Sequence, residues 1–140
     1  MRILGIDLGE KRIGIAISDP MGITAQGVAV IKSTEPSEDI EKIKEAMKMY
    51  GKIDEIIIGL PKTLKGKIGK QAEKVLKFKK LLESKINVPI KTWDERFTTV
   101  AVERVLIEAG LTRKKRKGVI DKEAAVYLLQ GYLDSRNEAK

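Results

Sequence analysis

The chain has 140 residues, 34% of them charged, and a formal net charge of +8. A chain of this length can bury a core of its own, so residues 1–140 are expected to form a single domain. Cysteine and histidine are both absent, which excludes disulfides, thiolate zinc sites and Ser-His-Asp catalysis. Carboxylates, Lys, Tyr or metal-bound water are left to carry any chemistry. No signal-like segment or membrane-spanning apolar run is found, and we expect a cytoplasmic protein without membrane contact.

The first segment predicts a β-hairpin. The apolar residues 3–8 form its first strand, Gly9 and Glu10 its turn, and the alternating residues 13–17 its second strand. Asp7 lies within the first strand, where a buried and unpaired carboxylate costs on the order of several kcal/mol. A metal cation can compensate for this charge, or Asp7 can accept hydrogen bonds from the turn backbone. The hairpin by itself leaves both interpretations open.

The rest of the chain predicts alternating strands and helices. A third strand is expected over 27–32, after a turn at 19–22, which completes an antiparallel meander. Ser37 is the expected N-cap of the first helix, and Gly51 follows its end. The helices are expected at 38–50, 70–84, 100–109 and 119–135, and the later strands at 53–59 and 88–94. The continuous apolar run of 53–59 is typical of a parallel strand that is covered on both faces.

The helical periodicity predicts which faces are buried. For the first helix these residues are Ile40, Ile43, Met47 and Tyr50. For the helix over 70–84 they are Ala72, Val75, Leu76 and Leu82. For the last helix they are Ala124, Leu128 and Tyr132.

Cations gather in two groups. An uninterrupted run fills the predicted loop before the last helix, and it consists of Arg113, Lys114, Lys115, Arg116 and Lys117. A looser group follows the strand over 53–59, and it consists of Lys62, Lys65, Lys67 and Lys70. Lys and Arg that neutralise phosphates release counterions, so such clusters favour a polyanionic partner. A charge-rich solvated surface is the alternative. Repulsion within the tight run favours a phosphate-facing role there, and the looser group fits a phosphate clamp or a solvated loop.

Three acidic positions can meet at one side of the predicted sheet. Asp94 and Glu95 end the last strand, and at most one of them shares a space with Asp7, because neighbouring side chains of an extended backbone point in opposite directions. Asp121 is expected near the start of the last helix, where capping and compensation of the helix dipole are its alternative roles. Clustered carboxylates are the ligands that Mg²⁺ prefers. A metal pair in such a site activates water and stabilises the leaving oxygen of a phosphodiester.

Four blocks that span nearly the whole chain resemble the YqgF/RuvX family: GIDLGEKRIGIAISD, IIIGLPKTLKG, WDERFTT and KKRKGVIDKEAAVYLLQGYLD. The resemblance implies an α/β fold of the ribonuclease H-like superfamily. Its mixed five-stranded sheet has three antiparallel strands followed by two parallel ones, flanked by helices. The resemblance also implies a metal-dependent endonuclease, a hydrolase that processes the 5′ end of precursor 16S ribosomal RNA in ribosome biogenesis. The related Holliday-junction resolvases make branched DNA the alternative substrate.

Applied to this chain, the resemblance implies Mg²⁺ or Mn²⁺ held by the catalytic acids Asp7, Glu95 and Asp121, with Asp94 as a further candidate ligand. The expected partner is structured nucleic acid, as precursor rRNA or in a pre-ribosomal particle. The residues expected to contact it are Lys11, Arg12, Lys62, Lys65, Lys67, Arg96, Arg113, Lys114, Lys115, Arg116 and Lys117. Trp93 and Phe97 are the aromatic residues near the expected site that could stack on unpaired bases.

Two other classes of protein remain alternatives. A non-catalytic rRNA-binding assembly factor would use the same basic surface and leave the acids idle. Actin-like and sugar-kinase phosphotransferases also begin with an Asp-x-Gly hairpin, but they need a longer, two-lobed chain, and Glu10 stands where Thr or Ser usually follows the Gly. The preference for RNA or DNA, the number of metal ions and the oligomeric state do not follow from the sequence.

Overall fold

The computed structural model describes residues 1–61, 69–94, 110 and 112–138, with 113–122 and 138 described by backbone alone. The elements are β1 (Ile3–Leu8), β2 (Arg12–Ser18), β3 (Ala25–Lys32), α1 (Pro36–Lys48), β4 (Glu55–Leu60), α2 (Lys70–Lys85), β5 (Ile90–Asp94) and α4 (Arg113–Glu138). The predicted helix over 100–109 lies outside the described residues. So do several predicted site residues, namely Lys62, Lys65, Lys67, Glu95, Arg96 and Phe97.

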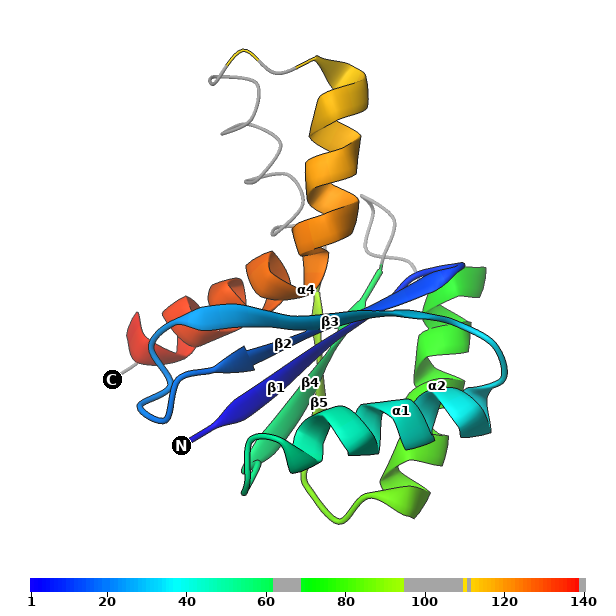
Figure 1. The fold of residues 1–140 in the computed structure, drawn as a ribbon, viewed down its shortest axis with the longest axis vertical. Coiled ribbons are helices and arrows are strands. Elements are labelled where there is room, and N and C mark those ends of the chain that lie inside the picture. Colours follow the sequence, from blue (N-terminus) through cyan, green and yellow to red (C-terminus); the bar gives the residue numbers. More distant parts are fainter. Residues whose placement is uncertain (62–68, 95–109, 111, 139–140) are drawn as a thin grey trace.

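The strands form one sheet in the order β3-β2-β1-β4-β5, with β1 at its centre (Figure 1). β1, β2 and β3 pair antiparallel, whereas β4 pairs parallel with both β1 and β5. The predicted mixed sheet is therefore confirmed. All residues of β4 are buried, as expected for a parallel strand between two neighbours and two helical layers.

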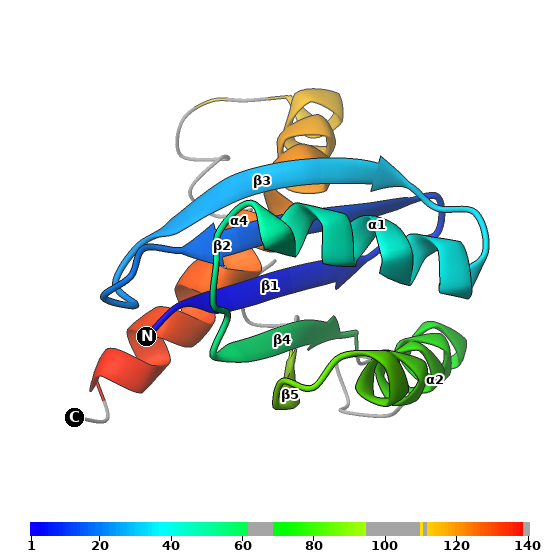
Figure 2. The same cartoon turned by 60° about the horizontal axis from the view of Figure 1, so that its bottom comes forward.

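Helices cover both faces of this sheet (Figures 1 and 2). α1 and α2 lie on one face, and the later turns of α4 lie on the other. Because successive side chains of a strand point to opposite faces, β1 contributes to both cores. Leu4, Ile6 and Leu8 belong to the core under α1 and α2, and Ile3 belongs to the core under α4.

The start of α1 differs from the prediction. The helix begins at Pro36 with Glu35 as its N-cap, and it ends at Lys48, so Ser37 is not the cap. Proline has no N–H to satisfy and its φ suits the first helical position, which explains the earlier start. Gly51, with φ of 73°, follows the helix as expected.

The buried face of α2 is largely as predicted. Ala72, Val75 and Leu82 are buried, but the prediction for Leu76 is wrong, because its side chain is 38% exposed. Phe78 fills the core in its place and is 5% exposed. The buried stripe therefore follows steps of three and four residues from Ala72 through Val75 and Phe78 to Leu82.

The last helix is longer than predicted. α4 begins at Arg113, so the basic run 113–117 is helical and does not form a loop. Lys and Arg are good helix formers, and a glycine such as Gly118 costs only about 1 kcal/mol in a helix, too little to end it. The early turns of α4 project beyond the sheet, and its later turns lie along the sheet (Figure 1).

The buried side of α4 is also shifted from the prediction. Leu128 is buried as expected, whereas Ala124 and Tyr132 are only partly buried. Ala125, Leu129 and Leu133 complete the face that packs on the sheet. Within the described parts of the chain, no helix is long and apolar enough to span a membrane.

Candidate metal and nucleic-acid site

Asp7 lies near the end of the central strand and pairs with Gly14 of β2. Its side chain is half-buried, and no described residue gives it a hydrogen bond or an ion pair. The turn that follows is closed by the backbone, where Gly9 N–H donates to the Arg12 carbonyl at 2.9 Å. The structure therefore does not support the interpretation of Asp7 as a hydrogen-bond acceptor for the turn.

Small residues bring α4 close to the sheet beside Asp7. A Cβ atom built on Gly14 would lie 3.8 Å from the Asp7 Cβ and 3.2 Å from the Ala125 Cβ. A Cβ atom built on Gly5 would lie only 2.9 Å from the Leu129 Cβ. Because Gly5 and Asp7 are two residues apart in one strand, Asp7 belongs to the sheet face that α4 covers.

Asp121 lies within α4 and not at its start, which corrects the predicted position. Its place in the helix is four residues before Ala125, the residue that packs beside Gly14. Residues four apart in an α-helix share one face, one turn above the other. The backbone thus puts positions 121 and 125 on the same face of α4.

The carboxyl ends of the three parallel strands lie at one edge of the sheet. Ile6 pairs with Ile58, and Leu60 pairs with Asp94 at the end of β5. Trp93 belongs to the core under α4, where its ring packs edge-on against Tyr132 with the centroids 5.4 Å apart. Since neighbouring residues of a strand alternate, Asp94 belongs to the opposite face of the sheet from Trp93 and Asp7.

The predicted ligands are therefore brought together only in part. Among the side chains that the structure describes, no three acids gather closely enough to hold a metal ion. The structure describes the side chain of Asp7 and the backbone of Asp121, and Glu95 lies outside the described residues. Trp93 is half-buried against Tyr132, so its indole ring is not the free stacking surface expected from the sequence.

Two of the predicted phosphate-binding cations are described at the same edge. Lys11 and Arg12 are exposed in and just after the turn between β1 and β2. The Lys11 carbonyl accepts a hydrogen bond from Ser33 N–H at 2.9 Å, and Arg12 pairs with Lys32 across β2 and β3. These backbone contacts fix the positions of the Lys11 and Arg12 main chain at this edge of the sheet.

Sequence reasoning missed a polar cluster under α4. The Tyr132 hydroxyl donates to the Glu55 carboxylate, which also lies 3.5 Å from Lys91 Nζ. Burial and the neighbouring Glu55 raise the pKa of Tyr132 to about 12. Glu55 is 5% exposed. The sequence signal that could have indicated this cluster is an acid at the start of an apolar strand. The cluster connects α4 to β4 and β5.

The strand order, the two helical layers and the acid in the central strand define a protein of the ribonuclease H-like class. The chain matches the RuvX family model, described as Holliday junction resolvase, over residues 1–135. It belongs to that family. A relative from Clostridium acetobutylicum is 56% identical over 135 residues, which covers 96% of this chain and 99% of that protein. A relative from Clostridium botulinum is 53% identical, over 96% of this chain and 98% of that protein. Both are named "Putative pre-16S rRNA nuclease".

Solved structures show the same fold at low sequence identity. Thermus thermophilus RuvC bound to a Holliday junction has a TM-score of 0.60 and 13% identity, and the match covers 99% of this chain and 96% of RuvC. The ROK hexokinase from Thermus thermophilus has a TM-score of 0.50 and 17% identity, over 74% of this chain and 37% of the kinase. The similarity to the kinase is thus limited to part of a much longer chain.

Proposed function

We propose that the chain is a metal-dependent endonuclease that processes precursor 16S ribosomal RNA. The observation that carries the proposal is the half-buried carboxylate of Asp7, which has no partner among the described residues and lies in the central strand beside α4. The names of the curated relatives support the substrate. The composition, without cysteine, supports a cytoplasmic location.

The residues present fit a divalent cation. A carboxylate that is partly withdrawn from water is compensated well by a cation, and Mg²⁺ and Mn²⁺ prefer oxygen ligands. The chain has no His or Cys that would favour a softer metal. When bound, such a cation supplies an activated water and stabilises negative charge on phosphodiester oxygens.

The pleat of β5 supports Glu95 over Asp94 as the ligand from this segment. Asp94 belongs to the face opposite Asp7, because Trp93 packs under α4. Neighbouring residues of an extended backbone alternate between the two faces of a sheet, so at most one of the two acids shares the face of Asp7. We therefore assign the site to Asp7, Glu95 and Asp121 and leave Asp94 out of it. Asp121 qualifies because it shares the helix face of Ala125, which packs beside Gly14 next to Asp7.

The cations are proposed to guide the phosphate backbone. Lys11 and Arg12 lie at the edge of the sheet where β1 ends. The run 113–117 lies on the turns of α4 that project beyond the sheet. The residues outside the described part of the chain that we assign to the same role are Lys62, Lys65, Lys67 and Arg96. Branched DNA is the second candidate substrate, favoured by the description of the family model.

The direct test is Asp7→Asn, which removes the charge and keeps the shape. Cleavage of a precursor 16S rRNA fragment with Mg²⁺ is expected to fall by about 100-fold or more, because loss of even an outer-shell partner costs 10–100-fold in metal affinity or activity. The melting temperature should not fall, since the amide removes a partly buried charge without a described partner.

The matched control is Glu41→Gln, an exposed acid of α1 whose partner among the described residues is Lys44, in a surface ion pair. Its cleavage rate should equal that of the parent. A four-way DNA junction assayed in parallel identifies the preferred substrate. Undiminished cleavage by Asp7→Asn would remove Asp7 from the mechanism, and RNA binding without turnover in the parent would favour the assembly-factor alternative.

A further inference from the structure

A cavity of about 350 Å³ lies on the side of the sheet opposite the proposed metal site. It opens between the end of β1, the loop from β3 to α1, and α2. Leu8, Phe78 and Leu81 give it an apolar floor. Leu8 directly follows Asp7 in β1, so the cavity and the proposed metal site share one edge of the sheet. This volume is at the small end of the range for ligand pockets, roughly 300–1,000 Å³.

One wall of the cavity offers hydrogen-bond acceptors. The Ser33 hydroxyl donates to the Asp39 carboxylate at 2.8 Å, and the Thr34 hydroxyl donates to the Glu38 carboxylate at 2.9 Å. A hydroxyl that has donated its proton can still accept. Glu10 adds an exposed carboxylate to the lining, whereas the Asp39 carboxylate, 2% exposed, already accepts from the Ser33 hydroxyl and from the Thr34 N–H at 3.0 Å. This wall therefore suits a ligand edge that donates hydrogen bonds.

The α2 side of the cavity carries two cations. Lys74 and Lys77 are exposed and, among the described residues, have no carboxylate partner. Lys79 of the same helix does have one, since its Nζ lies 3.4 Å from the Glu83 carboxylate.

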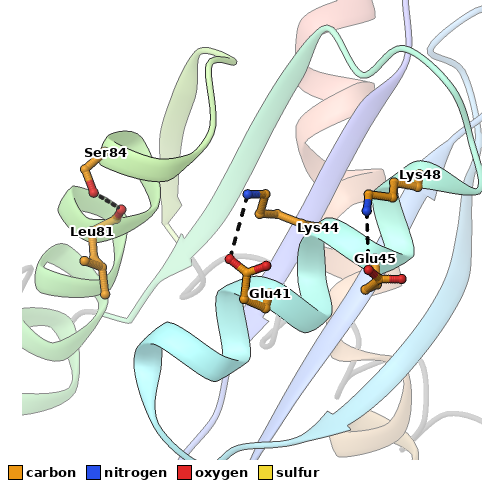
Figure 3. A network of polar contacts seen from close by, with 6 residues as sticks. All are labelled: Glu41, Lys44, Glu45, Lys48, Leu81 and Ser84. Atoms are coloured by element: carbon orange, nitrogen blue, oxygen red, sulfur yellow. Dashed lines mark hydrogen bonds and ion pairs between the residues drawn. The ribbon is translucent and has the colours of Figure 1, made fainter.

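Two lysines of α1 are paired with acids in the same way as Lys79, whereas Lys42 donates to the Lys32 carbonyl at 3.4 Å. Figure 3 shows Lys44 and Lys48 directed at Glu41 and Glu45, at 3.8 and 3.4 Å. Positions 74 and 77 are three apart on one helix, so both ammonium groups can reach the same anion. The cavity thus joins a cationic rim, an apolar floor and an acceptor wall.

We propose that this cavity binds one unpaired nucleotide of the nucleic acid substrate. The base lies over the apolar floor with its amino-bearing edge toward the hydroxyls of Ser33 and Thr34, and the phosphate lies at Lys74 and Lys77. Adenine, cytosine and guanine carry such an amino group, and uracil does not. The inference rests on the proposed function only in taking nucleic acid as the ligand, and it extends the substrate to an unpaired stretch beside the cleavage site.

The test measures binding without metal, so that cleavage does not interfere. Fluorescence anisotropy compares a blunt RNA duplex with the same duplex carrying a single-stranded extension, for the parent and for Lys74→Gln with Lys77→Gln. The double variant should lose about 10-fold in affinity for the extended duplex. The slope of log K against log salt should fall by about 0.7, because the two lysines hold one phosphate and each single-strand phosphate contact contributes about 0.7. Binding of the blunt duplex should not change.

The matched control is Lys80→Gln with Lys85→Gln, which removes the same charge from the same helix away from the cavity. It should leave the preference for the extended duplex intact. Equal losses for both pairs, or for both RNAs, would refute the subsite and indicate a general charge effect.

Base preference provides the second readout. Extensions of A or C should bind more tightly than extensions of U in the parent. Thr34→Val, at an exposed position, should reduce this preference, and Leu81→Trp, which fills the cavity, should abolish it while thermal unfolding reports that the variant is folded. Equal binding of U, A and C by the parent would refute the acceptor wall.

Failure of the subsite and failure of the nuclease are distinguishable. A parent that binds the extension through Lys74 and Lys77 but never cleaves keeps the subsite and refutes the proposed function. A parent that cleaves, with lysine variants that bind both RNAs as it does, keeps the function and refutes the subsite.

Discussion

Asp7 combines two properties that a structural residue rarely has together. It lies in the central strand of the sheet, and its half-buried carboxylate has no partner among the described residues. The buried acids that the structure describes elsewhere, Asp39 and Glu55, both accept hydrogen bonds. A carboxylate that the fold withdraws from water and leaves unpaired is a candidate for ligand binding, because the cost of its burial needs another source of compensation.

Tyr132 gives a prediction on pH dependence. Its pKa of about 12, raised first by burial and then by Glu55, exceeds the value of about 10 in an unfolded chain. The folded state therefore holds the phenol proton more tightly. The stability that follows is present below about pH 10 and is lost as the pH rises to about 12. The free energy of unfolding, measured by urea at each pH, should fall more steeply over this interval in the parent than in Tyr132→Phe.

The control for this prediction is Tyr127→Phe on the same helix. This variant keeps Tyr132 and Glu55, so the additional loss of stability that they cause between pH 10 and 12 should remain. If the curves of the parent and Tyr132→Phe run parallel from pH 10 to 12, the folded and unfolded states do not differ in their affinity for the Tyr132 proton.

At the scale of the elements, α4 packs closely on the sheet at two glycines. Gly5 and Gly14 occupy neighbouring strands under this helix, and neither leaves room for a larger side chain without adjustment by Leu129 or Ala125. The requirement comes from close packing and not from the backbone, because neither glycine has a positive φ. The sequence pattern marks these glycines only as small residues among apolar ones, so their role follows from the docked helix.

Gly5→Ala tests this packing. The new methyl group would lie 2.9 Å from the Leu129 Cβ, a contact that forces the helix or the strand to move. We expect the free energy of unfolding to fall by about 1–3 kcal/mol, the usual effect of overpacking. Metal-dependent cleavage should fall as well, since Asp7 and α4 shift relative to each other.

Gly27→Ala is the matched control under the same helix. Its methyl group would lie 3.5 Å from Val126 Cγ2, an ordinary van der Waals distance. Urea unfolding should show a change well below that of Gly5→Ala. Equal stability of the parent and Gly5→Ala would mean that α4 adjusts without cost.

At the scale of the whole molecule, charge is distributed unevenly. Cations of the run 113–117 occupy the projecting turns of α4, whereas three lysines on the side of α1 and its following loop are paired with acids. These are Lys44, Lys48 and Lys52, with ion-pair distances of 3.8, 3.4 and 3.8 Å. The net charge is +8, and the uneven distribution makes the projecting turns of α4 a better binding region for a polyanion than the side of α1.

Neutralising the run with Arg113→Gln, Lys115→Gln and Lys117→Gln should weaken RNA binding and flatten its salt dependence. The slope of log K against log salt should fall by about 2.1–2.7 if each residue contacts one phosphate, at about 0.7–0.9 per contact. Gln has a helix propensity close to that of Lys and Arg, so the start of α4 should be kept.

The control removes the same charge from Lys44, Lys48 and Lys52. Because these lysines are already paired with acids, the salt slope should stay near that of the parent. If both triple variants lower the slope equally, the run on α4 has no special place in RNA binding.

The sequence by itself determined the antiparallel meander, the parallel strand that follows the first helix, the acid inside the first strand and the basic character of the protein. These depend on local periodicity and composition, and the strands and α2 were predicted to within a few residues. The face to which Asp94 belongs, the start of α4 at Arg113 and the role of Gly5 were decided by the tertiary structure. The physical reason is that strand register and helix docking depend on contacts between segments far apart in the chain, as the approach of Leu129 to Gly5 illustrates.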